Sequence, residues 1–187
     1  YMDVFNPSTG EIIAKTPCCT ESEVEYAIEH AAKAFKTWSK VPPMKRAQIM
    51  FKVKQLIDDN MDELTQMLAT EHGKVLNEAQ GDVMKSREVT EIACGIPSLL
   101  MGESLMDASS GYDTVLYREP LGVFAGIVPF NFPAMIPMGW MVPLCIAAGN
   151  TIVLKAASMT PMTCMRMAEL YQQAGLPEGV INIVTCS

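Results

Sequence analysis

The second half of the chain alternates apolar runs with segments of helical periodicity. In order, these are residues 123–128, 133–148, 151–155, 160–174 and 180–184. Runs that are apolar throughout, rather than at every second residue, are typical of strands buried in a parallel sheet. Alternating strands and helices joined by short loops favour right-handed crossovers. The pattern therefore predicts an α/β fold, with a parallel β-α-β-α-β sheet within residues 123–187.

The first half has helical periodicity over most of its length. An Asn-Pro-Ser-Thr-Gly turn signal followed by an apolar run predicts a short hairpin within residues 4–16. Thr20 and Glu23 have the spacing of a capping box, which predicts the start of a helix. Pro43 is suited to open a second helix. The periodicity that follows is interrupted at Asn60, Gly73 and Gly95.

These patterns divide the chain into three parts. Residues 1–112 form a largely helical N-terminal part, and residues 123–187 form the parallel sheet. Between them, residues 113–122 are predicted to form a strand, at 114–118, and a turn. The chain starts at Tyr1 and ends just after an apolar run of a kind that usually needs further cover. We therefore expect it to be part of a longer protein.

Composition excludes several classes of function. The chain is 49% hydrophobic and has a net charge of −7, without a run of Lys and Arg, so a nucleic-acid surface is not expected. No signal peptide is visible. The most apolar stretch, residues 134–148, is too short to span a bilayer and contains two prolines, so no membrane segment is expected either.

The cysteines favour a reducing compartment over a disulfide framework. The chain has six cysteines and two histidines and contains no Cys-x-x-Cys, so a metal site is not expected. Cys145 and Cys164 lie in helical segments and Cys186 lies beside the final apolar run, and we interpret all three as buried thiols rather than nucleophiles. We expect a cytoplasmic protein, with the mitochondrial matrix as an alternative.

Asn131 is the most informative polar residue. The apolar run 122–128 leads into residues 129–133, Pro-Phe-Asn-Phe-Pro, in which Pro133 suits the first turn of a helix. An amide is thus placed at the C-terminal end of a strand, where α/β proteins bind their ligands. A fixed amide donor beside apolar residues suits a site where negative charge develops on oxygen. The alternative is that Asn131 only caps backbone groups of the loop.

An ordered series of motifs resembles the aldehyde dehydrogenase superfamily over nearly the whole chain. The motifs lie at residues 6–11, 71–79 (Glu-x-Gly-Lys-x-x-x-Glu-Ala), 119–123, 129–133, 149–155, 160–161 and 174–182. Phe130 replaces the Trp that is common at this position. With Phe there, the segment is most similar to the CoA-acylating methylmalonate-semialdehyde dehydrogenase branch. The resemblance implies an incomplete aldehyde dehydrogenase fold with a Rossmann-like cofactor part. It also implies an oligomerisation strand at residues 113–122 and a homodimer or homotetramer.

The resemblance implies a mechanism for the full-length protein. A cysteine thiolate attacks an aldehyde, which can be a semialdehyde. The Asn131 amide and a backbone N–H stabilise the oxyanion that forms. Hydride then passes to NAD or NADP and leaves a thioester, which water or CoA cleaves to an acid or an acyl-CoA. No cysteine in this chain has the family's Gly-Gln-x-Cys context. The catalytic domain is therefore absent, and we expect the 187 residues alone to be inactive.

The resemblance also assigns a cofactor site. It comprises Ile127, Val128, Pro129, Phe130, Lys155 and Ser158. Lys155 would contact the adenosine ribose. The alternative is that its side chain only extends to the rim of the sheet to keep its charge in water. The family usually has Glu at the position of Ser158, where it bonds the ribose and repels a 2′-phosphate. Ser158 lacks that charge, so we expect NADP to be accepted, alongside NAD.

Two further features bear on the substrate. In the methylmalonate-semialdehyde branch, an Arg near position 85 helps to hold the substrate carboxylate. Lys85 would supply the charge without the bidentate fork, and the alternative is a solvated helix charge. The helix after Asn131 is also about one residue longer than in that branch, near residues 138–140.

Two rival interpretations remain from the sequence. The first is a truncated or non-catalytic nucleotide-binding module. The second is an unrelated dinucleotide-binding protein, which the absence of a Gly-x-Gly-x-x-Gly motif disfavours.

Overall fold

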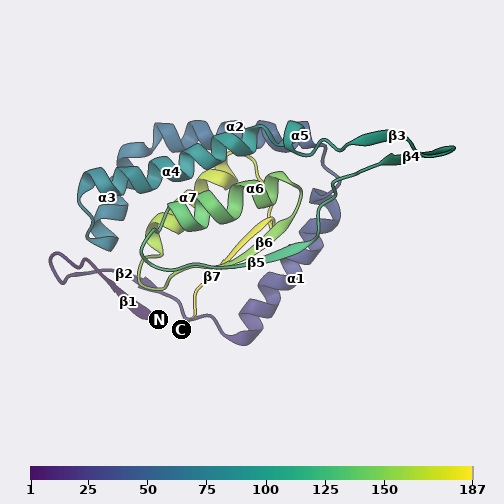
Figure 1. Cartoon of the computed structure of the whole chain (residues 1–187). Coiled ribbons are helices and arrows are strands. Elements are labelled where there is room, and N and C mark those ends of the chain that lie inside the picture. The colour runs from purple at the N-terminus through teal and green to yellow at the C-terminus, as the bar shows by residue number, and fades with distance from the viewer. Residues whose placement is uncertain (187) are drawn as a thin grey trace.

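The computed structural model describes residues 1–186, which form a layered α/β arrangement (Figure 1). The helices are α1 (Glu21–Trp38), α2 (Pro43–Asp59), α3 (Met61–His72), α4 (Leu76–Cys94), α5 (Ile96–Leu99), η1 (Met135–Met141), α6 (Val142–Ala147) and α7 (Met162–Gln173). The strands are β1 (Met2–Phe5), β2 (Ile12–Thr16), β3 (Ser104–Ser109), β4 (Tyr112–Val115), β5 (Val123–Ile127), β6 (Thr151–Lys155) and β7 (Ile181–Val184).

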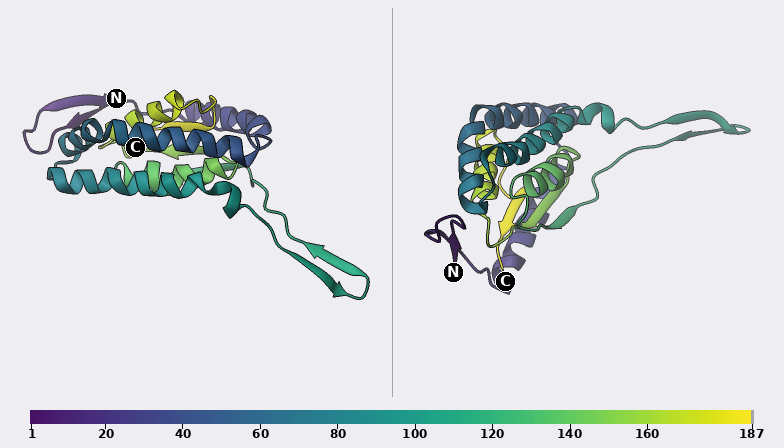
Figure 2. Two further views of the ribbon diagram at one scale, coloured as in Figure 1. Left: turned by 90° about the horizontal axis from the view of Figure 1, so that it is seen from above. Right: turned by 60° about the vertical axis from the view of Figure 1, so that its left-hand side comes forward.

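The sheet β5-β6-β7 is parallel and has helices on both faces. Helix α1 packs on one face, while α6 and α7 cover the other, and α2, α3 and α4 pack outside them (Figures 1 and 2). Trp38 anchors the two sides, because its indole N–H donates a 2.9 Å hydrogen bond to the carbonyl of Ile146. Among residues 1–186, none of the helices combines the length and apolarity that a bilayer crossing requires.

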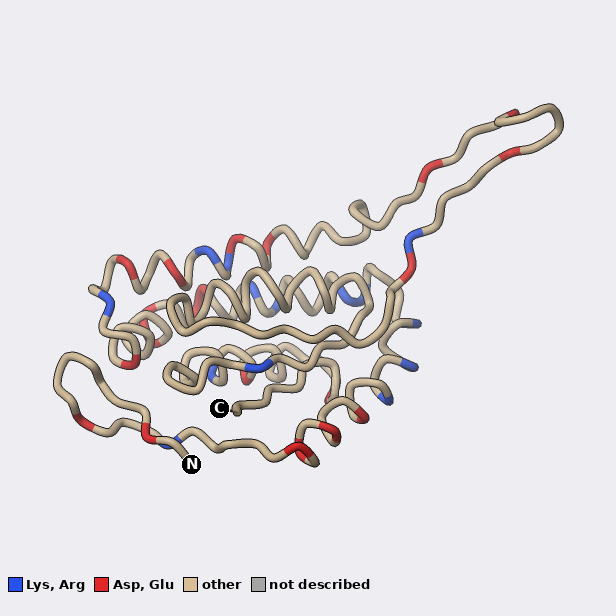
Figure 3. The backbone as a smooth tube through the Cα atoms, turned by 60° about the horizontal axis from the view of Figure 1, so that its bottom comes forward, with Lys and Arg blue, Asp and Glu red and all other residues tan. Residues whose placement is uncertain are grey.

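The local signals of the first half are confirmed. Strands β1 and β2 form the antiparallel hairpin. Thr20 and Glu23 make both hydrogen bonds of the capping box, and Pro43 is the first residue of α2. Gly73 ends α3 in the left-handed conformation, at φ 82°. Helix α1 also carries acidic residues in its first turn and a basic one in its last, as the tube in Figure 3 shows, which complements the helix dipole.

The prediction that residues 122–128 form a buried strand is wrong for this chain. Strand β5 lies at an edge of the sheet and pairs with β6 alone among the described residues. Its side chains are correspondingly open, with Phe124 38% and Ile127 77% exposed. Strand β6 in the middle has the expected burial. The apolar runs therefore identify the strands, but not which of them are central.

The predicted helix at residues 133–148 has a different form. It is a π-helix, η1, followed by α6, and the N–H of Val142 donates to the carbonyl of Pro137, five residues earlier. Pro137 and Pro143 have no N–H to continue an α-helical ladder, which favours the wider turn. The extra residue inferred near 138–140 stays a prediction.

A second hairpin projects from the body of the molecule (Figure 2). Strands β3 and β4 are antiparallel, with Gly111 in the left-handed conformation between them. The sequence predicted only the second strand, at 114–118, whereas the structure has β4 ending at Val115 and, before it, both α5 and β3 within residues 96–109. All residues of both strands are exposed, so their pattern carries no burial signal to read.

Candidate functional site

The candidate site lies at the carboxyl edge of the sheet, where β5 and β6 end side by side. The parallel register sets Ile127 opposite Lys155. Just beyond it, the N–H of Val128 donates a 3.2 Å hydrogen bond to the carbonyl of Lys155. This pairing brings together three of the residues that the sequence assigned to the cofactor. The loop carrying Asn131 starts from the same edge.

The edge presents apolar surface beside a cation. Ile127 is 77% and Phe130 53% exposed, while Val128 is buried behind them. Lys155 is half-buried, and no carboxylate of residues 1–186 lies within ion-pairing distance of its ammonium group. Open apolar side chains next to an unpaired cation suit a ligand that combines flat apolar rings with polar or anionic groups. A nicotinamide dinucleotide has this chemistry, so the residues present fit it.

The Asn131 loop is held by charged groups from the helical part of the chain. The ammonium of Lys74 donates to the carbonyl of Asn131 at 2.8 Å and pairs with Asp82 Oδ2, also at 2.8 Å. It lies 4.0 Å from the ring centroid of Phe132. Asp82 Oδ1 accepts the N–H of Met135 at 2.7 Å. The loop is therefore fixed on both sides of Pro133.

Lys74 and Asp82 are residues of the site that the sequence did not predict. Lys74 belongs to the Glu-x-Gly-Lys motif, which marked it as a family feature without a role. Asp82 has no motif, and its side chain is fully buried in the structure. Buried carboxylates almost always have a partner, but burial is known only after α4 has packed against η1.

The other side of the loop is held from α7 and the segment before it. The hydroxyl of Thr160 donates to the carbonyl of Phe130 at 3.2 Å. Glu71 accepts the N–H groups of Met162 and Thr163 at 2.7 and 2.9 Å, so its carboxylate caps the first turn of α7. Burial raises the pKa of the Glu71 carboxyl, against these hydrogen bonds, which lower it.

Ser158 lies where β6 and β7 end. Its hydroxyl donates to the carbonyl of Cys186 at 3.1 Å, and its own carbonyl accepts from the hydroxyl of Thr16 at 2.9 Å. Residues 155–162 contain no Asp or Glu. The segment that follows β6 therefore places no negative charge of its own beside Lys155.

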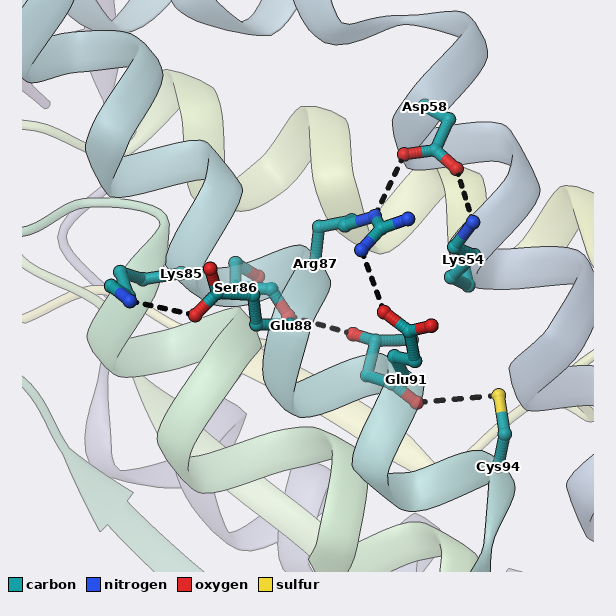
Figure 4. Close-up of polar contacts among 9 residues, drawn as sticks. Lys54, Asp58, Lys85, Ser86, Arg87, Glu88, Glu91 and Cys94 are labelled. Carbon is teal, nitrogen blue, oxygen red and sulfur yellow. Dashed lines mark hydrogen bonds and ion pairs between the residues drawn. The ribbon is translucent and has the colours of Figure 1, made fainter.

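Lys85 lies on the outward face of α4 (Figure 4). Its ammonium pairs with Glu88 at 2.7 Å, and the side chains of Lys85 and Glu88 are 60% and 45% exposed. Arg87 is engaged by Asp58 at 2.9 Å and by Glu91 at 2.6 Å. A substrate carboxylate would thus have to displace Glu88 from Lys85. The assignment of Lys85 to the substrate stays a prediction.

Three cysteines are poor nucleophiles in this structure. Cys164 is buried, and burial raises the pKa of its thiol to about 12. Burial also raises the pKa of the Cys145 thiol to about 12, and that of Cys94 above its ordinary value. At neutral pH these groups are thiols rather than thiolates. The interpretation as a buried thiol is confirmed for Cys164, whereas Cys145 and Cys186 are only partly buried.

Comparison with known proteins gives a consistent result. A sequence model of the aldehyde dehydrogenase family matches residues 1–187. Malonate-semialdehyde dehydrogenase of Bacillus pumilus is 51% identical over 181 residues, which are 97% of this chain and 37% of that protein. The crystal structure of methylmalonate-semialdehyde dehydrogenase from Oceanimonas doudoroffii has a TM-score of 0.96 and 43% identity, covering 100% of this chain and 38% of that one.

A further solved structure contains a cofactor. The putative methylmalonate-semialdehyde dehydrogenase from Sinorhizobium meliloti 1021, complexed with NAD, has a TM-score of 0.95 and 41% identity. The match covers 100% of this chain and 38% of the Sinorhizobium meliloti chain. The chain therefore spans less than two-fifths of the length of the relatives it matches.

Proposed function

The chain belongs to the aldehyde dehydrogenase family, and from this premise we propose that the full-length protein oxidises an aldehyde with NAD or NADP as hydride acceptor. One observation carries the proposal. The register between β5 and β6 sets Ile127 opposite Lys155, so the Asn131 loop begins at the sheet edge that carries Lys155, which has no ion-pair partner among residues 1–186. Aldehyde oxidation needs an oxyanion donor beside a cofactor, and this edge offers a place for both.

In the proposed mechanism, each part of the edge has a task. The side-chain amide of Asn131 donates a hydrogen bond to the oxyanion that forms when a thiolate attacks the aldehyde. Lys155 binds the adenosine ribose, and residues 127–130 line the cofactor. The bound cofactor supplies the hydride acceptor. A thioester remains on the attacking cysteine until water or CoA cleaves it.

We propose that the nucleophile lies outside these residues. The chain covers 37% of the Bacillus pumilus relative, none of its cysteines has the family's Gly-Gln-x-Cys context, and burial raises the pKa of the Cys145 and Cys164 thiols, which disfavours them as nucleophiles. The isolated chain is therefore expected to be inactive. The full-length protein is proposed to be a homodimer or homotetramer in which residues 113–122 contribute to the interface.

The substrate class follows from the relatives. Names of the similar proteins specify malonate semialdehyde and methylmalonate semialdehyde. We propose a semialdehyde carrying a carboxylate, with CoA as the acyl acceptor. Lys85 is a candidate for the carboxylate contact, which requires release of its partner Glu88.

The test uses the full-length protein with malonate semialdehyde and NAD or NADP. We expect substrate-dependent formation of reduced cofactor, and acyl-CoA among the products when CoA is present. Asn131→Ala should lower kcat by about 10²- to 10³-fold. Asn77→Ala, at an exposed position of α4, is the control and should leave kcat unchanged.

Two results would contradict the proposal. A full-length protein that binds NAD but reduces none would favour a non-catalytic nucleotide-binding module. Turnover by the isolated 187-residue chain would show that the nucleophile lies within it.

A further inference from the structure

We propose that Lys74, itself held by Asp82, is the positioning residue that orients the Asn131 amide toward the oxyanion. The inference rests on the proposed function, because it concerns the same reaction. It adds two residues from the helical part of the chain to the site. Neither would touch the substrate, since Lys74 acts through the backbone of Asn131.

The contact is made at the residue whose orientation matters. Lys74 donates to the carbonyl of Asn131 itself, one bond from the α-carbon that bears the amide side chain. Fixing the direction of that carbonyl fixes the peptide plane after Asn131, and with it the rotation available to the α-carbon. If the backbone of Asn131 can rotate, its side-chain amide loses the alignment that an oxyanion donor needs.

The clamp has more than one point of attachment. Asp82 bonds the N–H of Met135 through one carboxylate oxygen and the Lys74 ammonium through the other. The Lys74 ammonium also lies 4.0 Å from the centroid of the Phe132 ring. One ion pair therefore contacts the loop at Asn131, Phe132 and Met135. This arrangement ties the loop to the connection before α4, through Lys74, and to α4 itself, through Asp82.

Because the Lys74–Asp82 ion pair is buried, its contribution to folding stability does not explain its presence. The side chain of Asp82 is 0% exposed and that of Lys74 is 12% exposed. Removing both charges from water costs free energy that their attraction roughly offsets, so a buried pair adds little net stability. The pair does constrain geometry, because the hydrogen bonds that Lys74 donates and Asp82 accepts are directional. A role in geometry accounts for its presence better than a role in stability.

Gly73 contributes to the placement of Lys74. It ends α3 at φ 82°, and a β-carbon there would lie 2.7 Å from Pro7 Cγ. The chain therefore turns sharply before Lys74, which lies in the short connection between α3 and α4 rather than in a helix. From there its ammonium reaches a loop that lies 57 residues away in the sequence.

The test measures the rate per active site in the full-length enzyme. Lys74→Met keeps the length of the side chain and removes the donor. We expect kcat per site, with sites counted from the burst of reduced cofactor, to fall about 10- to 100-fold. The KM for NAD should change less than about threefold, since Lys155 and residues 127–130 are untouched. Lys52→Met, at an exposed position of α2, is the matched control and should be neutral.

Asp82→Asn provides the second variant. In this variant the side-chain carbonyl oxygen can still accept the N–H of Met135, but the negative charge that pairs with Lys74 is lost. We expect a fall of about tenfold in kcat per site, and a double variant no worse than Lys74→Met alone, because the two residues act as one unit. A purely structural role would lower the number of active sites and leave the rate per site unchanged, which would overturn the proposal.

A readout that does not need activity separates this inference from the proposed function. Amide hydrogen exchange within residues 131–135 should accelerate in both variants relative to Lys52→Met. Unchanged exchange and unchanged rate per site would each reject Lys74 as the positioning residue. An inactive wild-type protein whose loop loosens in both variants would reject the proposed function and leave the positioning of the loop supported.

Discussion

Gly139 packs so closely against Ser86 that a β-carbon at position 139 would lie 2.8 Å from the α-carbon of Ser86. The contact comes four residues after the hydrogen bond between Asp82 and Met135, so α4 and η1 run along one another. Backbone cannot move aside as the end of a side chain can. The approach of the two helices, and with it the position of the Asn131 loop, depends on glycine at this position.

Gly139→Ala is therefore expected to destabilise the fold by about 1–3 kcal/mol, the usual cost of forcing extra volume into a packed interior. Gly81→Ala is the matched control. It lies in α4, and a β-carbon added there would meet nothing within 4 Å. That change should stabilise by about 0.5–1 kcal/mol, because alanine favours helix. Urea unfolding of both variants measures the difference, and a neutral Gly139→Ala would contradict the close contact.

Glu71→Ala should also be strongly destabilising. It leaves the N–H groups of Met162 and Thr163 without their acceptor in a buried place. Each unsatisfied group costs about 1–3 kcal/mol, so we expect a loss of at least about 2 kcal/mol. Glu25→Ala, on the exposed face of α1, should change stability by less than about 0.5 kcal/mol. Equal unfolding midpoints for the two variants would show that Glu71 does not cap α7.

Acid should weaken the link between α3 and α7. Hydrogen bonds from Arg166, at 2.8 and 3.0 Å, hold the pKa of the Glu63 carboxyl below its ordinary value of 4.5. A lowered folded-state pKa means that the stabilisation is present above pH 4.5 and is lost as the pH falls through the folded value. The stability difference between wild type and Glu63→Gln should thus shrink between about pH 6 and about pH 3. A difference that stays constant over this range would rule out a contribution from the pair.

Ser158→Glu should shift the cofactor preference of the full-length protein toward NAD. The new carboxylate would stand at the end of β6, where residues 155–162 now contain no acidic group, and it would repel a 2′-phosphate. We expect the ratio of NADP to NAD affinity to fall about tenfold or more, measured by fluorescence titration with both cofactors. Ser158→Ala, which adds no charge, is the control. A wild-type protein that binds no NADP would remove the basis of this prediction.

Much of the fold could be predicted from local sequence signals. The capping box at Thr20 and Glu23, the proline that opens α2 and the glycine that ends α3 act within one turn of chain, so they are visible in sequence. The apolar runs likewise identified β5, β6 and β7. The exposed hairpin β3–β4 gave a partial signal, because no face of it is buried.

The sequence by itself determined most of the helices and strands, and which strand ends carry Asn131 and Lys155, since these depend on neighbours along the chain. It also indicated the family, through an ordered series of motifs. Only the tertiary structure decided that β5 is an edge strand, that η1 is a π-helix, and that Lys74 and Asp82 hold the Asn131 loop. The contacts of Lys74 and Asp82 join residues 57 and 53 positions apart, and the edge position of β5 depends on which strands pair, so neither exists until the chain has packed.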